Sequence, residues 1–169
     1  VAPTAIPTPT ATPTVAPDGT AAIFYIENGT DNLICTNKDV ATYAIIPEGI
    51  KSIGSSAFGN CKQLKSVSIP ESVTSIGDYA FYECRHLTGV EIPEGVTSIG
   101  WKSFSGCSSL TEVRLPEGMK YMESYAFSDC TNLRTVVFSE GITSIGWGAF
   151  SYCSNLTEIK IPEGVESID

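Results

Sequence analysis

The sequence repeats itself every 23 residues, and this period constrains the fold more than any other feature. Units written in the same phase begin at Ile46, Ile69, Ile92, Leu115 and Phe138, and a sixth begins at Ile161 and stops at Asp169. A cysteine and a leucine recur in every complete unit: Cys61, Cys84, Cys107, Cys130 and Cys153, with Leu64, Leu87, Leu110, Leu133 and Leu156. Such registration is the signature of a repeat architecture in which each unit is one turn of a solenoid.

Each unit contains more than one kind of local structure. The segment "LTEVRLP" (110–116) predicts a short strand, because its apolar residues alternate with Glu112 and Arg114 and a proline ends it. The segment "GVTSIG" (95–100) predicts a second extended piece that leads into a turn. Apolar residues spaced as in 80–84 then predict one short helical turn. Coils of this kind hide their inward faces by stacking at the strand spacing of about 4.8 Å.

One corner of the coil carries a recurrent glycine, at Gly54, Gly77, Gly100 and Gly146. We expect this corner to need an unusual φ angle, which glycine adopts without a steric penalty. The fourth unit has Glu123 in that place, and Met119, Tyr121 and Met122 also depart from the consensus. The sequence therefore predicts a local distortion in the fourth unit.

The full unit, "IPEGVTSIGxxAFxxCxxLxxVx", resembles the BspA-like leucine-rich repeat family of bacterial surface proteins over residues 46–169. The resemblance implies a right-handed repeat solenoid of the leucine-rich repeat type. Short parallel strands would line its concave face, with short helical turns and extended segments elsewhere. It also implies binding to proteins or host matrix outside the cell, with a secreted or cell-surface location, but it names no partner.

Two further segments precede the repeats. Residues 1–20 hold five prolines and six threonines, a composition that predicts a semi-rigid linker. Residues 21–45 break the period, and "AIFYIENGTDNLICT" (22–36) predicts a β-hairpin around Asn28 and Gly29 that caps the first coil. The predicted domains are thus linker 1–20, cap 21–45 and leucine-rich repeat domain 46–169. The linker suggests a multimodular secreted protein with further modules in the same polypeptide.

Composition excludes two classes of partner. A net charge of −9 and a pI near 4.5 argue against nucleic acid and against attachment to anionic lipid through basic residues. No apolar run reaches the roughly 20 residues of a membrane-spanning helix, so we expect no membrane insertion.

Two recurrent columns of side chains have alternative interpretations. The cysteine column points every thiol into the core, so free buried thiols are favoured over disulfides or a metal site, which usually needs closely spaced cysteine pairs. A glutamate also recurs in all six units, at Glu48, Glu71, Glu94, Glu117, Glu140 and Glu163. Solvated carboxylates on turns are favoured there over a ladder of divalent cations, which require six to eight oxygen ligands. We expect no metal and no cofactor.

Catalysis has little support. The only histidine, His86, occupies an outward-facing column otherwise filled by small polar residues, and the serines belong to the repeat itself. The sequence therefore predicts a protein that is not an enzyme.

Binding residues are sought at variable outward positions, because fixed positions build the core. The first candidate surface is aromatic and consists of Trp101, Trp147, Tyr79, Tyr125 and Tyr121. The second lies on the concave strand face and consists of Glu112, Arg114, Glu158, Lys160 and Glu91. The alternatives are that each Trp only shields its own coil, and that the strand face is merely solvated.

The predicted function is a non-catalytic extracellular binding module that mediates protein–protein interaction or adhesion. The alternatives are a carbohydrate-binding module that uses the surface Trp and Tyr residues, which makes polysaccharide the second candidate partner, and a rigid spacer between modules.

Overall fold

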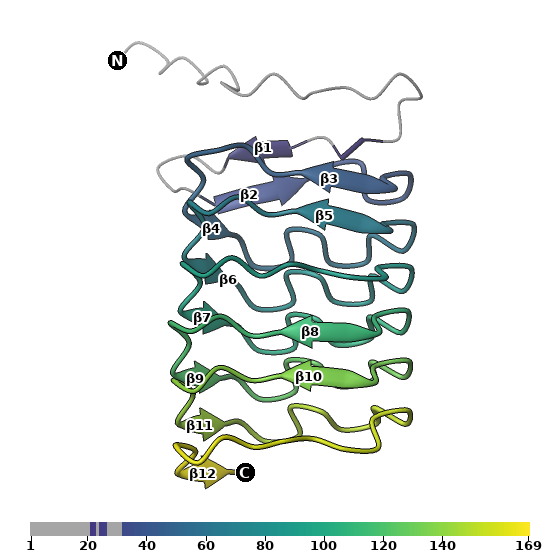
Figure 1. Ribbon diagram of the computed structural model, residues 1–169. Coiled ribbons are helices and arrows are strands. Elements are labelled where there is room, and N and C mark those ends of the chain that lie inside the picture. The colour runs from purple at the N-terminus through teal and green to yellow at the C-terminus, as the bar shows by residue number, and fades with distance from the viewer. Residues whose placement is uncertain (1–20, 23, 27–31) are drawn as a thin grey trace, which may run out of the picture.

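The computed structural model describes residues 21–22, 24–26 and 32–169, which form a column of stacked coils (Figure 1). The two segments predicted as a linker and as the turn of a hairpin, residues 1–20 and 27–31, lie outside the described residues. The strands of the described part are β1 (Phe24–Ile26), β2 (Asn32–Cys35), β3 (Tyr43–Ile45), β4 (Ser52–Ile53), β5 (Ser66–Ser68), β6 (Ser75–Ile76), β7 (Ser98–Ile99), β8 (Glu112–Arg114), β9 (Tyr121–Met122), β10 (Thr135–Val137), β11 (Ser144–Ile145) and β12 (Ser167–Ile168).

The continuous sheet runs along one side of the column. Its strand order is β1-β2-β4-β6-β7-β9-β11-β12, and all its pairs except β1 with β2 are parallel. Five of these eight strands are a Ser-Ile pair, which belongs to "TSIG" in β6, β7 and β11, with Ser75 opposite Ser98 and Ile76 opposite Ile99. The Ile side chains of β4, β6, β7 and β11 are buried in the core and their Ser side chains are more exposed, whereas Ile168 of β12 is 61% exposed. The second extended piece of each unit therefore builds the longest ladder in the protein.

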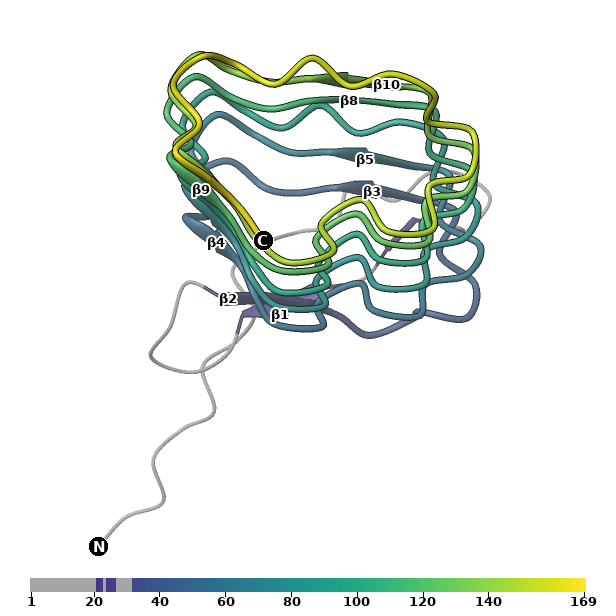
Figure 2. The same ribbon diagram turned by 90° about the horizontal axis from the view of Figure 1, so that it is seen from below.

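The "LxxVx" segments form a second side of each coil, which meets the side of the long sheet at a corner (Figure 2). Here the predicted strand at 110–116 is confirmed as β8, which pairs in parallel with β10, and β3 pairs in parallel with β5. Residues 89–91 and 158–160 occupy the same place in their coils but are not in strands. This is the side that was expected to be concave, and its ladder is interrupted once, between β5 and β8, and ends at β10.

The third side of each coil consists of consecutive turns, and the described residues contain no helix. The short helical turn expected at 80–84 does not form, because two residues in each coil adopt left-handed φ angles. In the second coil these are Tyr79 (φ 55°) and Glu83 (φ 58°). Left-handed residues four positions apart leave too short a right-handed run for a helix. Instead, the Phe81 amide donates to the Ser103 carbonyl of the next coil at 2.7 Å.

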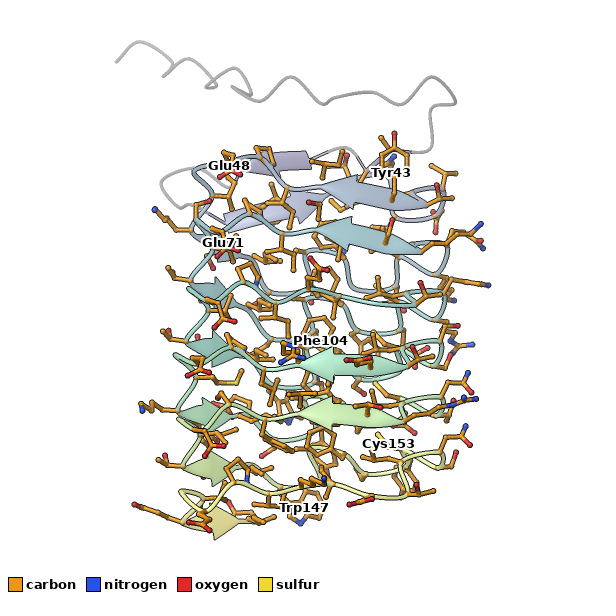
Figure 3. The ribbon with its side chains drawn as sticks, viewed as in Figure 1. Tyr43, Glu48, Glu71, Phe104, Trp147 and Cys153 are labelled. Carbon is orange, nitrogen blue, oxygen red and sulfur yellow. The ribbon has the colours of Figure 1, made fainter. Side chains whose placement is uncertain are left out.

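The core consists of columns of identical side chains. The rings of Phe58, Phe81, Phe104 and Phe127 stack with centroids 4.9–5.1 Å apart and planes within 10° of parallel. The thiols lie beside them, and the Cys107 Sγ donates to the Phe81 carbonyl at 3.2 Å. Figure 3 shows Phe104 and Cys153 inside the column. Stacking on neighbouring coils thus buries side chains that a single coil would leave exposed.

The recurrent corner glycines serve close packing rather than backbone freedom. Gly77, Gly100 and Gly146 do not have positive φ angles, so the expectation of an unusual φ at this corner is wrong. A Cβ added to Gly100 would lie 2.6 Å from the Asp78 backbone nitrogen in the preceding coil. The left-handed position instead lies two residues later, where Lys102 has a φ of 52°.

The fourth coil shows the expected distortion, although it is small. Lys102 N donates to Ser124 O at 3.3 Å, whereas the equivalent bonds between other coils measure 2.8–2.9 Å. Glu123, which stands in place of the corner glycine, directly precedes the acceptor of this longer bond. Met119 and Met122 remain fully buried, so the core columns continue through this coil.

The N-terminal end of the column is covered by β1 and β2, which pair antiparallel and continue the long sheet through β4. Leu33 and Cys35 of β2 are buried. The Cys35 amide donates to the Ala57 carbonyl just as Phe58 donates to Ala80, so Cys35 takes the phenylalanine place in the first layer. No helix in the described residues is long and apolar enough to cross a membrane.

Candidate functional site: two outward surfaces

The first candidate surface lies on the turns that follow the tight glycine corner. Trp101 directly follows Gly100, and its backbone N–H donates to Asp78 Oδ1 of the preceding coil at 2.8 Å. Tyr79 and Tyr125 occupy the next column, whose left-handed φ angles measure 55° and 57°. Trp101 and Trp147 thus follow the same glycine corner two coils apart, and Tyr79 and Tyr125 lie two coils apart in the next column.

Four of the five predicted aromatic residues form two matched pairs. Tyr79 contacts Trp101 edge to face, with centroids 4.9 Å apart and planes at 79°. Tyr125 contacts Trp147 in the same way, at 4.9 Å and 86°. We call each contact a Tyr–Trp pair.

Two residues that sequence reasoning missed extend this surface. Tyr82 packs against Tyr79 at 5.4 Å. The Lys102 ammonium lies 4.8 Å from the Trp101 ring and 5.1 Å from the Tyr125 ring, so it bridges the two pairs by cation–π contacts. Tyr82 stands out in the sequence because its column otherwise holds only Gly and Ser. We call these residues together the aromatic strip: Tyr79, Tyr82, Trp101, Lys102, Tyr125 and Trp147.

The strip is accessible to solvent. Trp101 is 37% exposed and Trp147 is 60% exposed, while Tyr79, Lys102 and Tyr125 are half-buried. Figure 3 shows Trp147 near the C-terminal end of the column. Other coils carry Ser55 and Ser124 in the tryptophan column, so the coil itself does not require an aromatic side chain there.

The fifth aromatic candidate, Tyr121, lies elsewhere. It projects from β9 in the long sheet, between Ser98 and Ser144. Its hydroxyl donates to Glu123 Oε2 at 3.1 Å, and partial burial followed by this carboxylate raises the pKa of Tyr121. Among the ring contacts of the described residues, none joins Tyr121 to the strip.

The second candidate surface is the side formed by β3, β5, β8 and β10. Its five predicted residues are all exposed, and we call them the charged face: Glu91, Glu112, Arg114, Glu158 and Lys160. The first three line one open hollow of about 610 Å³, beside the interrupted segment 89–91. The last two line another of about 740 Å³, beside the segment 158–160. The structure thus divides the predicted face between two hollows.

The charges of this face are not paired with one another. In the described part of the chain, the one ion pair joins Arg85 to Glu83 at 2.6 Å, on a different side of the coil. Arg114 lies one coil beyond Glu91 in the same column, yet the two form no ion pair. These groups are therefore available to a partner.

The recurrent glutamates are exposed at the turn that precedes the long sheet. Figure 3 shows Glu48 and Glu71 one above the other at the outer surface. Glu94 Oε2 accepts a hydrogen bond from the Glu117 backbone N–H at 2.9 Å, so this carboxylate supports the next coil. Within the described ranges, no group of three potential metal ligands comes together.

All six cysteines are buried. Burial raises the pKa of the Cys84 thiol from 9.0 to about 12, and burial also raises the pKa of Cys107 well above its ordinary value. A thiol held in its protonated form is a poor nucleophile. His86 is exposed on the turn side, away from these thiols.

The repeat and the fold agree with those of known proteins. The pattern described as "BspA type Leucine rich repeat region" matches residues 34–100 and 74–169 in six copies, and so begins within the segment predicted as a cap. No curated protein matches the sequence.

Solved structures with a similar fold are bacterial leucine-rich repeat proteins. One from Bacteroides ovatus is 24% identical with a TM-score of 0.61, over 87% of this chain and 47% of that one. One from Eubacterium ventriosum is 26% identical with a TM-score of 0.61, over 91% and 49%. One from Bacteroides capillosus is 31% identical with a TM-score of 0.58, over 68% and 91%. The chain spans about half the length of the first two. With the family pattern covering most of its length, the chain belongs to the BspA-type leucine-rich repeat family.

Proposed function

We propose that this chain is a non-catalytic protein-binding module, and that the charged face is the surface that recognises the partner. The observation that carries the proposal is that Glu91, Glu112 and Arg114 are exposed around one hollow without pairing to one another. Charged groups of opposite sign on a partner could form ion pairs with these side chains, which favours fast and selective association. Leucine-rich repeat proteins generally mediate protein interactions, which supports the same choice.

The interrupted ladder adds to the case for a protein partner. Between β5 and β8, residues 89–91 leave the strand pairing, and a Cβ added to Gly89 would meet nothing within 4 Å. The charged face is therefore hollowed as well as charged, whereas an uninterrupted row of strands would present a more even surface. Protein interfaces combine such shape complementarity with polar contacts at the rim.

We also propose a secreted or cell-surface location and an adhesive role within a larger multimodular protein. The support is membership of a family found on bacterial surfaces together with the Thr/Pro-rich composition of residues 1–20. That composition suits a spacer between modules.

The test is a binding screen by biolayer interferometry against purified extracellular-matrix and secreted proteins. The double variant Arg114→Glu with Lys160→Glu should weaken binding of the partner at least about tenfold, because it reverses the charge of both cations of the charged face. Lys51→Glu with Lys120→Glu is the matched control, since it makes the same charge change at two exposed residues beside the long sheet. An equal loss in this control would contradict recognition by the charged face. If no protein in the screen bound, the chain would be better explained as a rigid spacer.

A further inference from the structure

The aromatic strip repeats along the axis of the solenoid. Its two Tyr–Trp pairs have the same centroid distance, 4.9 Å, and nearly the same interplanar angle, 79° and 86°. They are two coils apart, since Tyr79 and Tyr125 occupy the same column of the second and fourth units. A surface that presents the same group twice along one line suits a ligand that also repeats.

The spacing of the two pairs follows from the core. Phenylalanine rings of neighbouring coils are 4.9–5.1 Å apart. Positions two coils apart are therefore separated by about 10 Å, twice the strand spacing. This is close to the length of a disaccharide unit in an extended, β-linked sugar polymer. Alternate sugars of such a polymer would meet equivalent Tyr–Trp pairs.

The strip is also narrow. Beside it, the same columns carry the exposed polar residues Ser55, Ser56 and Asp78. A stable protein interface needs about 800 Å² on each partner around an apolar centre, and the strip lacks such surroundings. A slender chain that lies along the column needs only the line of rings.

The chemistry of the strip fits sugars without charge. Trp and Tyr offer an apolar ring face, against which the C–H face of a sugar packs, together with a polar edge for its hydroxyls. The Lys102 ammonium is already shared between the Trp101 and Tyr125 rings. With a net charge of −9, the protein as a whole repels acidic polymers.

From these observations we infer that the aromatic strip is a second binding site, separate from the charged face, and that its ligand is a neutral, β-linked polysaccharide lying along the solenoid axis. Trp101 and Trp147 each stack on one sugar. Lys102 holds the intervening rings in place.

Tryptophan fluorescence tests this directly, because Trp101 and Trp147 are the two tryptophans of the whole chain. The full chain is titrated with cellohexaose, xylohexaose and mannohexaose, and with the disaccharides of the same sugars. At least one hexasaccharide should shift the emission to shorter wavelength and saturate. Its disaccharide should bind at least about tenfold more weakly, because it reaches only one Tyr–Trp pair.

Gel retardation by the corresponding polysaccharides then compares variants. Trp101→Ser and Trp147→Ser are the sharpest changes, because Ser55 and Ser124 occupy this column naturally. Each should weaken retardation at least about tenfold, as expected for removing a central aromatic anchor, and the double variant should abolish it. Arg114→Glu, on the charged face, should leave retardation unchanged.

Three results would overturn the inference. One is the absence of any emission shift or retardation with all three sugars. Another is retardation that survives in the double tryptophan variant. The third is a protein partner whose binding requires Trp101 and Trp147, which would make the strip a protein-binding surface. None of these depends on whether the charged face binds its own partner.

Discussion

Replacing Phe104 by alanine should destabilise the protein more than the same change at the end of the column. Phe104 is fully buried and lies between two parallel rings, Phe81 at 5.0 Å and Phe127 at 5.1 Å. Phe150 is half-buried, with Phe127 at 5.8 Å on one side and Phe138 at 75° to it. The two residues therefore share a column but differ in burial and in how closely and how nearly parallel their ring neighbours pack.

The expected magnitudes follow from these surroundings. Removing a fully buried Phe side chain costs about 3–5 kcal/mol, and the loss of two ring neighbours places Phe104→Ala near the upper end, at about 4–5 kcal/mol. Phe150→Ala removes a side chain that is only partly buried and should cost about 1.5–2.5 kcal/mol. With a total stability of about 5–15 kcal/mol, the first change would remove a large fraction of it.

Urea unfolding followed by far-UV circular dichroism measures both changes. Phe104→Ala should move the midpoint to much lower urea than Phe150→Ala, with the slope of each transition near that of the parent protein. If Phe104→Ala cost no more than Phe150→Ala, the continuous phenylalanine column would not be a main source of stability.

Three further predictions address other positions of the coil. Gly100→Ala should reduce the free energy of unfolding by about 1–3 kcal/mol, because its Cβ would lie 2.6 Å from Asp78 N. Gly89→Ala, whose Cβ would meet nothing within 4 Å, should leave the free energy of unfolding unchanged or raise it slightly, and equal effects of the two variants in urea unfolding would contradict the tight corner. Ser103→Ala should raise the melting temperature, because the buried Ser103 hydroxyl has no hydrogen-bond partner and the other coils have alanine at this position. A lower melting temperature would show that this hydroxyl makes a hydrogen bond in the folded protein. Stability should fall as pH rises from 9 towards 12, because the folded protein raises the pKa of Cys84 from 9.0 to about 12 and so retains a proton that the unfolded chain releases. Cys84→Ala should make this alkaline decline shallower by up to about 1.4 kcal/mol per pH unit, and an unchanged slope in urea unfolding at several pH values would refute the assignment.

The period alone predicts much of this fold. Because each column repeats every 23 residues, the burial of the Cys and Leu columns, the strand at 110–116 and the stacking of coils all follow from the sequence. The exposed aromatic column could also be predicted from the sequence, since Trp101 and Trp147 occupy a column that holds serine in other coils and is not part of the core.

Features set by contact between coils could not be predicted in the same way. The glycine at position 100 looks like a backbone requirement in the sequence, but the distance to the coil beneath is what excludes a side chain. Tyr79 and Lys102 adopt left-handed φ angles, although neither residue type indicates such a conformation in the sequence. Tyr121 was predicted to belong to the aromatic surface, yet the sheet places it on another side.

The two proposed sites share one structural logic. Fixed residues hold adjacent coils about 5 Å apart, and variable residues project outward in columns at that spacing. The charged face and the aromatic strip lie on different sides of the column, so a change in one leaves the packing of the other intact.

Amide hydrogen exchange of the free protein, resolved by residue, tests the central claim that each 23-residue unit is one coil bonded to the next. The amides of Phe58, Phe81, Phe104 and Phe127 each donate to a carbonyl in the following coil at 2.7–2.9 Å. Phe150 has the same place in the last complete unit, and its amide makes no such bond within the described residues. A stacked solenoid predicts slow exchange that recurs every 23 residues at the first four amides and fast exchange at Phe150. Fast exchange at Phe81 and Phe104, or protection without this period, would contradict a stacked solenoid.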